Sequence, residues 1–319
     1  RKRKMARVET MTFSHTEKKR KARMNTVSRP AEFVIHIVLI LFCLVCVIPF
    51  IFVGIISFTS EESIREIGYS FLPKKLSLQA YRYVFDLGDQ LWRSYFNSFY
   101  ITIAGTFLSV LISVLYSYAL FRKDYKYRRF FTVFCFFTML FGGGLAPTYM
   151  VCKNLLRLSD NYAALIVPTL LNPFNVIIMR TFFQTSIPLD LLDSAAIDGS
   201  GEYHTLFHIV LPISKPGIAS ISLLTSLAYW NEWFLSMLYI RDAKYYPLQY
   251  LLMRMQNQVD FLVKNSSKIG PEAAKIMRDL PQESLRMALV VLIVIPIAFA
   301  YPFFQRYIIS GLTIGSIKG

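Results

Sequence analysis

Six runs of mostly apolar residues, each longer than 20 residues, constrain this 319-residue chain more than any other feature. The hydrocarbon core of a bilayer is ~30 Å thick and a helix rises ~1.5 Å per residue, so about 20 apolar residues cross it. Helices satisfy their backbone polar groups within such a run, whereas barrel strands would be about half as long and would alternate. The sequence therefore predicts an all-α, polytopic membrane protein with six transmembrane helices. The expected spans are Phe33–Phe58, Tyr95–Phe121, Phe130–Val151, Tyr162–Phe183, Pro216–Ile240 and Ser284–Ile309.

The positive charges predict which ends of the spans face the cytoplasm. Residues 1–29 carry 11 Lys and Arg against two Glu, and Arg122–Arg129 carries five against one Asp. Basic residues near span ends concentrate on the cytoplasmic side, so both segments and both termini are expected inside the cell. Most of the net charge of +15 lies in residues 1–29, outside the spans, so it indicates membrane lipid and not nucleic acid as a partner. The first run is longer than the apolar part of a cleavable signal peptide, and no A-x-A-like site follows it.

This topology divides the chain into four parts. Residues 1–29 are a basic cytoplasmic tail, and residues 30–94 hold the first helix and an extracellular loop. Residues 95–310 form the transmembrane core, and residues 311–319 form a second cytoplasmic tail.

Loop 184–215, called the inner loop below, should also be cytoplasmic, but its charge has the opposite sign. Lys215 is its one basic residue, and its acidic residues are Asp190, Asp193, Asp198 and Glu202. An acidic loop on this side indicates that a partner protein covers it instead of lipid headgroups. Packing against its own subunit, or in the membrane interface, is the alternative.

Two short helices are expected in the inner loop. Ser186-Ile187-Pro188 looks like a helix start, with a hydroxyl cap and an early proline. Gly199 can adopt the left-handed conformation that ends this helix. The second helix would carry an apolar face at i, i+3, i+4 and i+7. That face is formed by Tyr203, Leu206, Phe207 and Val210.

The inner loop resembles the signature of binding-protein-dependent ABC importer permeases, E-A-A-x(3)-G-x(9)-I-x-L-P. Asp193 stands at the Glu position, and Ser194 and Ala195 stand at the two Ala positions. Aspartate keeps the charge on a shorter arm, and serine keeps the small size. The remaining positions of the signature are matched by Gly199, Ile209, Leu211 and Pro212.

Other segments extend the resemblance over residues 30–319. Residues 141–149, 175–183 and 229–234 are similar to carbohydrate-uptake permeases. Residues 305–319 are similar to the smaller, six-span subunit of the maltose-type pair. Within this family the chain looks closest to the permeases of importers for complex oligosaccharides or polysaccharide fragments, which are typical of Gram-positive bacteria.

The resemblance implies an ABC importer type I permease fold and a complex in which different subunits have different roles. The chain would pair with a second, homologous permease above two ATPase subunits that bind ATP and Mg²⁺. An extracellular solute-binding protein, expected to be a lipoprotein, would deliver an oligosaccharide, and loop 241–283 would help to dock it. The inner loop would hold the coupling helix, which lodges in a cleft of the ATPase. The implied ATPase-coupling residues are Asp193, Ala195, Gly199, Leu206, Phe207, Ile209, Leu211 and Pro212.

Polar residues inside the fourth and fifth spans are candidates for the translocation path. Glu232 is the main one, because ionisable residues within a membrane are rare and are functional by default. Aromatic rings, amides and carboxylates are the groups that hold sugars. The alternatives are a contact between helices with the second permease subunit or an interfacial aromatic belt, and for the fourth span a packing kink. The candidate path residues are Asn172, Asn175, Trp230, Asn231, Glu232 and Trp233.

Nothing in the sequence indicates catalysis or nucleotide binding by this chain. It lacks G-x(4)-G-K-[ST] and G-x-S-x-G, so we expect no enzyme activity, no metal and no cofactor of its own. His204 and His208 are four residues apart, but they lack the Glu of H-E-x-x-H and a third ligand. An ion-coupled sugar transporter is the alternative function. Such a transporter should show acidic or histidine relays and inverted repeats, and the sequence has one mid-span Glu and no visible repeat.

Overall fold

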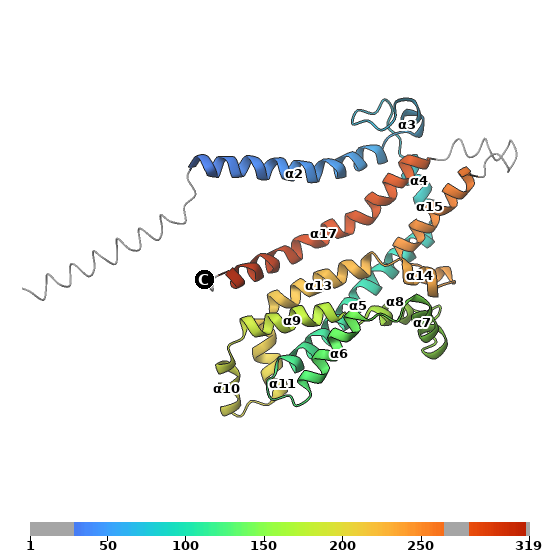
Figure 1. The fold of residues 1–319 in the computed structure, drawn as a ribbon. Coiled ribbons are helices and arrows are strands. Elements are labelled where there is room, and N and C mark those ends of the chain that lie inside the picture. Colours follow the sequence, from blue (N-terminus) through green and yellow to red (C-terminus); the bar gives the residue numbers. More distant parts are fainter. Residues whose placement is uncertain (1–28, 265–280, 317–319) are drawn as a thin grey trace, which may run out of the picture. The chain divides into compact units, whose positions relative to one another are not determined.

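The computed structural model describes residues 29–264 and 281–316, so the expectations for both tails and for part of loop 241–283 lie largely outside it. The described residues are helical throughout, apart from turns, loops and one isolated β-bridge between Thr59 and Leu76 (Figure 1). The chain divides into two units, residues 1–55 and residues 56–319. The described part of the first unit, residues 29–55, lies entirely in helix α2, Arg29–Ser57.

Three helices in the described residues are long and apolar enough to cross a membrane without a break. They are α2, α5 (Asp89–Phe121) and α17 (Gln282–Ser316). They correspond to the first, second and sixth predicted spans. The predicted ends of these spans agree with the observed helix ends to within a few residues in most cases. The exceptions are the start of α5 and the end of α17, where the observed helix is longer than the predicted span.

The third and fourth predicted spans each correspond to a pair of helices that are bent at a short break, and the first part of the fifth predicted span forms a third such pair with the helix before it. Counting each pair as one span gives six. In the first pair, α6 (Arg128–Leu140) is followed by α7 (Leu145–Met150) and η1 (Val151–Leu155) at 112°. The bend follows from the glycine run that ends at Gly144, whose φ of +82° suits glycine.

Prolines mark the other two bends. Helices α8 (Ala163–Ile166) and η2 (Val167–Thr169) meet α9 (Pro173–Ser186) at 54°. The Asn172 side chain accepts a hydrogen bond from the Phe174 N–H and so caps α9. The last pair joins the second helical part of the inner loop to α13 (Lys215–Trp230) at 79°, and Pro216 lies in the first turn of α13.

The fifth predicted span does not continue to Ile240 as one helix. Helix α13 ends at Trp230, and after a short break α14 covers Phe234–Tyr239. Helix α5 packs against α13 and α9, and α13 packs against α17 (Figure 1). Helix α5 is therefore the central helix of the second unit.

Helices also occupy the two regions that we expected to be extracellular loops. The first region holds α3 (Glu61–Ile67) and α4 (Gln79–Phe85), and the second holds η4 (Ala243–Tyr245) and α15 (Leu248–Lys264). Helix α15 is amphipathic and not apolar enough to register as a span. Its buried residues are Leu248, Leu251, Leu252, Met255 and Val259.

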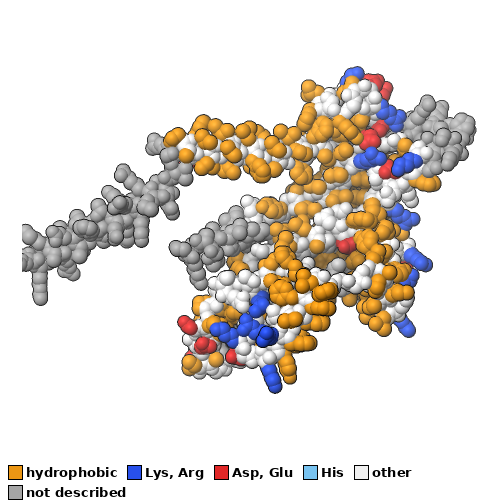
Figure 2. All heavy atoms as spheres, viewed as in Figure 1, with side chains coloured by type: hydrophobic (Ala, Val, Ile, Leu, Met, Phe, Trp, Pro, Cys, Tyr) orange, Lys and Arg blue, Asp and Glu red, His pale blue; other side chains and the backbone are white. Residues whose placement is uncertain are grey.

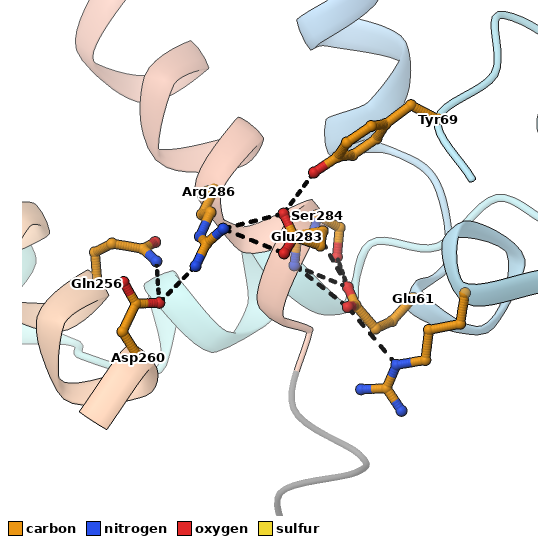
Figure 3. Close-up of polar contacts among 8 residues, drawn as sticks. Glu61, Tyr69, Gln256, Asp260, Glu283, Ser284 and Arg286 are labelled. Carbon is orange, nitrogen blue, oxygen red and sulfur yellow. Dashed lines mark hydrogen bonds and ion pairs between the residues drawn. The ribbon is translucent and has the colours of Figure 1, made fainter. Parts of the chain in front are cut away.

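Polar contacts join three of these helices where α17 begins (Figure 3). The Glu61 carboxylate, 7% exposed, accepts hydrogen bonds from the Glu283 and Ser284 N–H groups and so neutralises the start of α17. Arg286 pairs with Asp260 of α15 at 2.7 Å. The Arg286 hydrogen bond lowers the pKa of Asp260, so this contact stabilises the fold above the ordinary carboxyl pKa of about 4. That stability is lost as the pH falls through the lowered value.

Candidate functional site

The first helix of the inner loop is α10, Leu189–Ile197, and Gly199 ends it as predicted. The φ of Gly199 is +78°. The Ser200 N–H donates to the Ala195 carbonyl at 2.9 Å, and the Gly199 N–H donates to the Ala196 carbonyl at 3.1 Å. These two bonds form the Schellman motif, which satisfies the last carbonyls of the helix.

The predicted start of this helix is wrong. Ser186 is the last residue of α9, and α10 follows Pro188 without a side-chain cap. The residue before a proline is held out of the helical conformation, and Ile187 accordingly has φ −112° and ψ 111°. The proline therefore ends α9 as well as starting α10, and the hydroxyl of Ser186 is not needed at the break.

The second helix of the inner loop consists of α11 (Glu202–His204), η3 (Thr205–Val210) and α12 (Leu211–Ile213). Segment η3 is a π-helix, whose wider turns change which side chains share a face. Leu206 and Val210 are buried, whereas Tyr203 is 82% and Phe207 is 48% exposed. The predicted single apolar face is therefore split in two.

One side of the inner loop packs on the chain's own spans. Leu206 is only 3% exposed and lies in an apolar cluster, called the inner cluster below. This position corrects the expectation that Leu206 fills a cleft of a partner, because its side chain is already covered. The buried members of the inner cluster are Val114, Tyr118, Phe121, Met179, Phe183, Ile187, Leu192, Leu206, Val210 and Ile221.

Other residues of the inner loop expose large apolar side chains. Ile197 is 86% exposed, and with Tyr203 and Phe207 it forms what we call the exposed face. The exposed carboxylates Asp193 and Asp198 come from the same segment. Figure 2 shows acidic side chains gathered at this corner of the second unit beside a cluster of Lys and Arg. Ile197 is not among the predicted coupling residues, and Tyr203 was predicted only as part of the apolar face that also held Leu206, Phe207 and Val210.

The structure brings together three of the predicted coupling residues. Ala195, Gly199 and Ile209 line an open hollow of about 450 Å³ at the turn between the two helices. Asp193 is exposed on α10, away from this lining. Leu211 is half-buried, and Pro212 is exposed.

A polar cavity of about 290 Å³ lies between α5, α9 and α13. Three of the predicted path residues line it, namely Asn172, Asn175 and Glu232. Asn175 is buried and donates to the Thr225 hydroxyl at 3.0 Å. The remaining lining residues are Ser109, Thr169, Phe174, Leu224, Thr225, Ala228 and Tyr229.

Glu232 has a structural contact as well as a place in the cavity wall. Its Oε1 accepts a hydrogen bond from the Leu235 N–H at 2.8 Å, in the first turn of α14. The carboxylate thus helps to start the helix that follows the break after α13. The variants chosen at Glu232 must therefore distinguish the loss of this capping contact from the loss of a contact with a solute.

The other predicted path residues do not line the polar cavity. Trp230 is buried, and its indole N–H donates to the Ile293 carbonyl of α17 at 3.2 Å. Asn231 is exposed and accepts a hydrogen bond from Gln249, and Trp233 is 40% exposed. Because the helix breaks after Trp230, these neighbouring side chains point in different directions. Trp230 thus makes a contact between helices, but with α17 of its own chain and not with a second permease subunit.

Residues 130–314 match the family described as "Binding-protein-dependent transport system inner membrane component". The polygalacturonan/rhamnogalacturonan transport system permease protein YtcP of Bacillus subtilis is 38% identical over 292 residues, which are 92% of this chain and 99% of YtcP. Protein LplC of Bacillus subtilis is 36% identical over 86% of this chain and 90% of LplC.

A solved structure has a similar fold. A chain of a bacterial ABC transporter involved in the import of the acidic polysaccharide alginate aligns with a TM-score of 0.72 and 29% identity. The alignment covers 88% of this chain and 99% of the other. The region that matches the transport family, residues 130–314, contains the inner loop and most of the polar cavity.

Proposed function

Because the chain belongs to the family of binding-protein-dependent transport system inner membrane components, we propose that it is the permease subunit of an ATP-driven importer of oligosaccharides. The observation that carries this proposal is the match to YtcP, a polygalacturonan/rhamnogalacturonan transport system permease protein, over nearly the whole length of both chains. Fragments of an acidic polysaccharide are the proposed substrate class. The alginate importer supports the same class through its fold.

We place the subunit in the cell membrane of a Gram-positive bacterium, with both termini in the cytoplasm. A second, homologous permease would complete the translocation path, and two ATPase subunits with ATP and Mg²⁺ would drive it. An extracellular solute-binding protein, proposed to be a lipoprotein, would deliver the substrate. The abundance of basic residues in 1–29 and Arg122–Arg129 supports this orientation.

The inner loop is the proposed coupling element for alternating access. Its exposed face, Ile197, Tyr203 and Phe207, would enter the ATPase cleft, with Asp193 and Asp198 at the rim. Large exposed apolar side chains of this kind mark surfaces that a partner covers. The inner cluster would then pass the movement of the inner loop to the spans.

The polar cavity is the proposed contribution of this subunit to the path. Asn172, Asn175 and Glu232 supply amides and a carboxylate that can hydrogen-bond hydroxyl groups of a sugar. Trp230, Asn231 and Trp233 are left out of the proposed path, because they do not line this cavity.

The function is tested by uptake into proteoliposomes that contain both permeases and the ATPases. Accumulation of oligogalacturonides should require ATP and the binding protein, and an imposed proton or sodium gradient should have no effect. Uptake that follows an ion gradient without ATP would overturn the proposal in favour of a secondary transporter.

Replacing Glu232 with alanine is expected to change the concentration dependence of uptake. A hydrogen bond to a charged group contributes about 1.5–3 kcal/mol, so losing one from a sugar should raise the half-saturating concentration at least about tenfold. Glu232→Gln keeps an oxygen that can accept the Leu235 N–H and removes only the charge. Uptake curves for both variants that match the unsubstituted transporter would limit Glu232 to capping α14.

A further inference from the structure

The inner loop is fastened to the inner end of α5 by a carboxylate with two donors. Glu202 Oε2 accepts a hydrogen bond from the Tyr118 hydroxyl at 2.7 Å, and Oε1 accepts one from the Arg122 guanidinium at 2.7 Å. Tyr118 lies in the last turn of α5, and Arg122 directly follows that helix. The Arg122 side chain is only 19% exposed. We call these three residues the clamp.

Apolar packing holds the same joint together. Leu206 and Val210 of the inner loop share the inner cluster with Val114, Tyr118 and Phe121 of α5. Well-packed side chains transmit strain because the protein interior is dense and resists compression. A displacement of the inner loop therefore reaches α5 through the clamp and the inner cluster together.

Helix α5 can carry such a displacement over a long distance. It has 33 residues without a break, which corresponds to about 50 Å at ~1.5 Å per residue. The three bent pairs of helices have breaks that can absorb movement, at angles of 54° to 112°. Among the core spans that touch the inner loop, α5 is thus the one without a break.

The far end of α5 is fastened to residues 243–248, the segment that leads into α15. Asn97, fully buried, donates to the Lys244 carbonyl at 2.8 Å and to the Tyr246 carbonyl at 3.0 Å. The Ser98 hydroxyl accepts a hydrogen bond from the Leu248 N–H at 2.7 Å, and Gln90 donates to the Ala243 carbonyl at 2.8 Å. These side-chain contacts fix the backbone of residues 243–248 to α5.

We propose that α5 is a rigid lever that couples the inner loop to residues 243–248 on the opposite side of the membrane. Glu202 and Asn97 are the positioning residues at its two ends. The inference rests on the proposed function. It identifies the helix that links the cytoplasmic side, where the ATPases lie, to the outer side, where the binding protein docks. Thermodynamic coupling is reciprocal, so engagement of the binding protein outside must also act on the inner loop through α5.

The test uses the full complex in lipid nanodiscs, and it measures ATP hydrolysis with and without the loaded binding protein. Glu202→Gln and Asn97→Leu should each reduce the stimulation by the binding protein at least about fivefold, the lower end of usual allosteric coupling, while the unstimulated rate is kept. The pair Glu202→Arg with Arg122→Glu should restore part of the stimulation, because it rebuilds the ion pair with reversed ends but not the hydrogen bond from the Tyr118 hydroxyl. Glu62→Gln, which breaks an exposed ion pair with Lys75 at 2.9 Å away from α5, is the matched control.

The double variant Glu202→Gln with Asn97→Leu tests whether the two substitutions act through one lever or act independently. A single lever predicts that the double variant loses no more stimulation than the stronger single variant. If Asn97→Leu lowers the yield of the complex, Gln90→Leu replaces it at the same end of α5. Normal stimulation of the assembled single variants, or losses that multiply in the double variant, would overturn the lever. Absence of stimulation in the unsubstituted complex would instead contradict the proposed function.

Discussion

Gly199→Trp is expected to abolish most uptake while the complex still assembles in the membrane and hydrolyses ATP. Gly199 has a φ of +78°, and a left-handed conformation costs a residue with a Cβ about 1–2 kcal/mol. A Cβ added there meets nothing within 4 Å, so the indole would project into the open hollow at the turn of the inner loop. The indole would then occupy the space in which we place the ATPase. Uptake and ATP hydrolysis should be measured on the same proteoliposomes.

Two smaller substitutions separate backbone strain from bulk at this turn. Gly199→Ala adds the strain without the indole, and asparagine adopts the left-handed conformation more readily. Uptake should therefore fall far less in Gly199→Ala and least in Gly199→Asn. Normal uptake by Gly199→Trp would count against coupling through this turn.

Gly105→Leu should destabilise the packing of α5 on α13. A Cβ at Gly105 would lie 2.7–2.8 Å from three carbons of the Tyr229 ring. The Tyr229 hydroxyl donates to the Ile166 carbonyl at 3.0 Å, which holds the ring in place. Overpacking a well-packed site costs about 1–3 kcal/mol. The midpoint of thermal unfolding in detergent should fall accordingly.

The controls for this substitution use the same helix contact. Gly105→Leu combined with Tyr229→Ala should recover part of the lost stability, because the ring that clashes is gone. Gly142→Ala, where an added Cβ meets nothing within 4 Å, should unfold at the normal temperature. A Gly105→Leu variant as stable as the unsubstituted protein would show that α5 and α13 are not this closely packed.

Hydropathy predicted the membrane helices well wherever the chain runs straight, as in α2, α5 and α17. Residues that favour a break in a helix lie at two of the bends, namely Gly144 and Pro173. The angle at each bend depends on packing between distant segments, which no local pattern contains. Helix α15 was missed because its apolar residues cover one face only and do not form a continuous run.

The glycine turn of the inner loop was predicted correctly, but the start of its first helix and the faces of its second helix were not. The left-handed conformation of Gly199 could be predicted because glycine adopts it without a steric cost, whatever its distant neighbours are. The faces of the second helix were assigned at 3.6 residues per turn, and the π-helical turns of η3 moved Leu206 inside and left Phe207 half-exposed. The roles of Trp230 and Glu202 depend on contacts with α17 and α5, far away in the sequence, and so they could not be predicted.

The central claim is that the exposed face of the inner loop meets an ATPase on the cytoplasmic side, and a cysteine at Ile197 tests it most directly. In a chain whose four native cysteines are replaced, Ile197→Cys should form a cross-link to the ATPase subunit. A membrane-impermeant maleimide added to intact cells should not label it. Labelling from outside the cell, or no cross-link to an ATPase in the assembled transporter, would contradict the account.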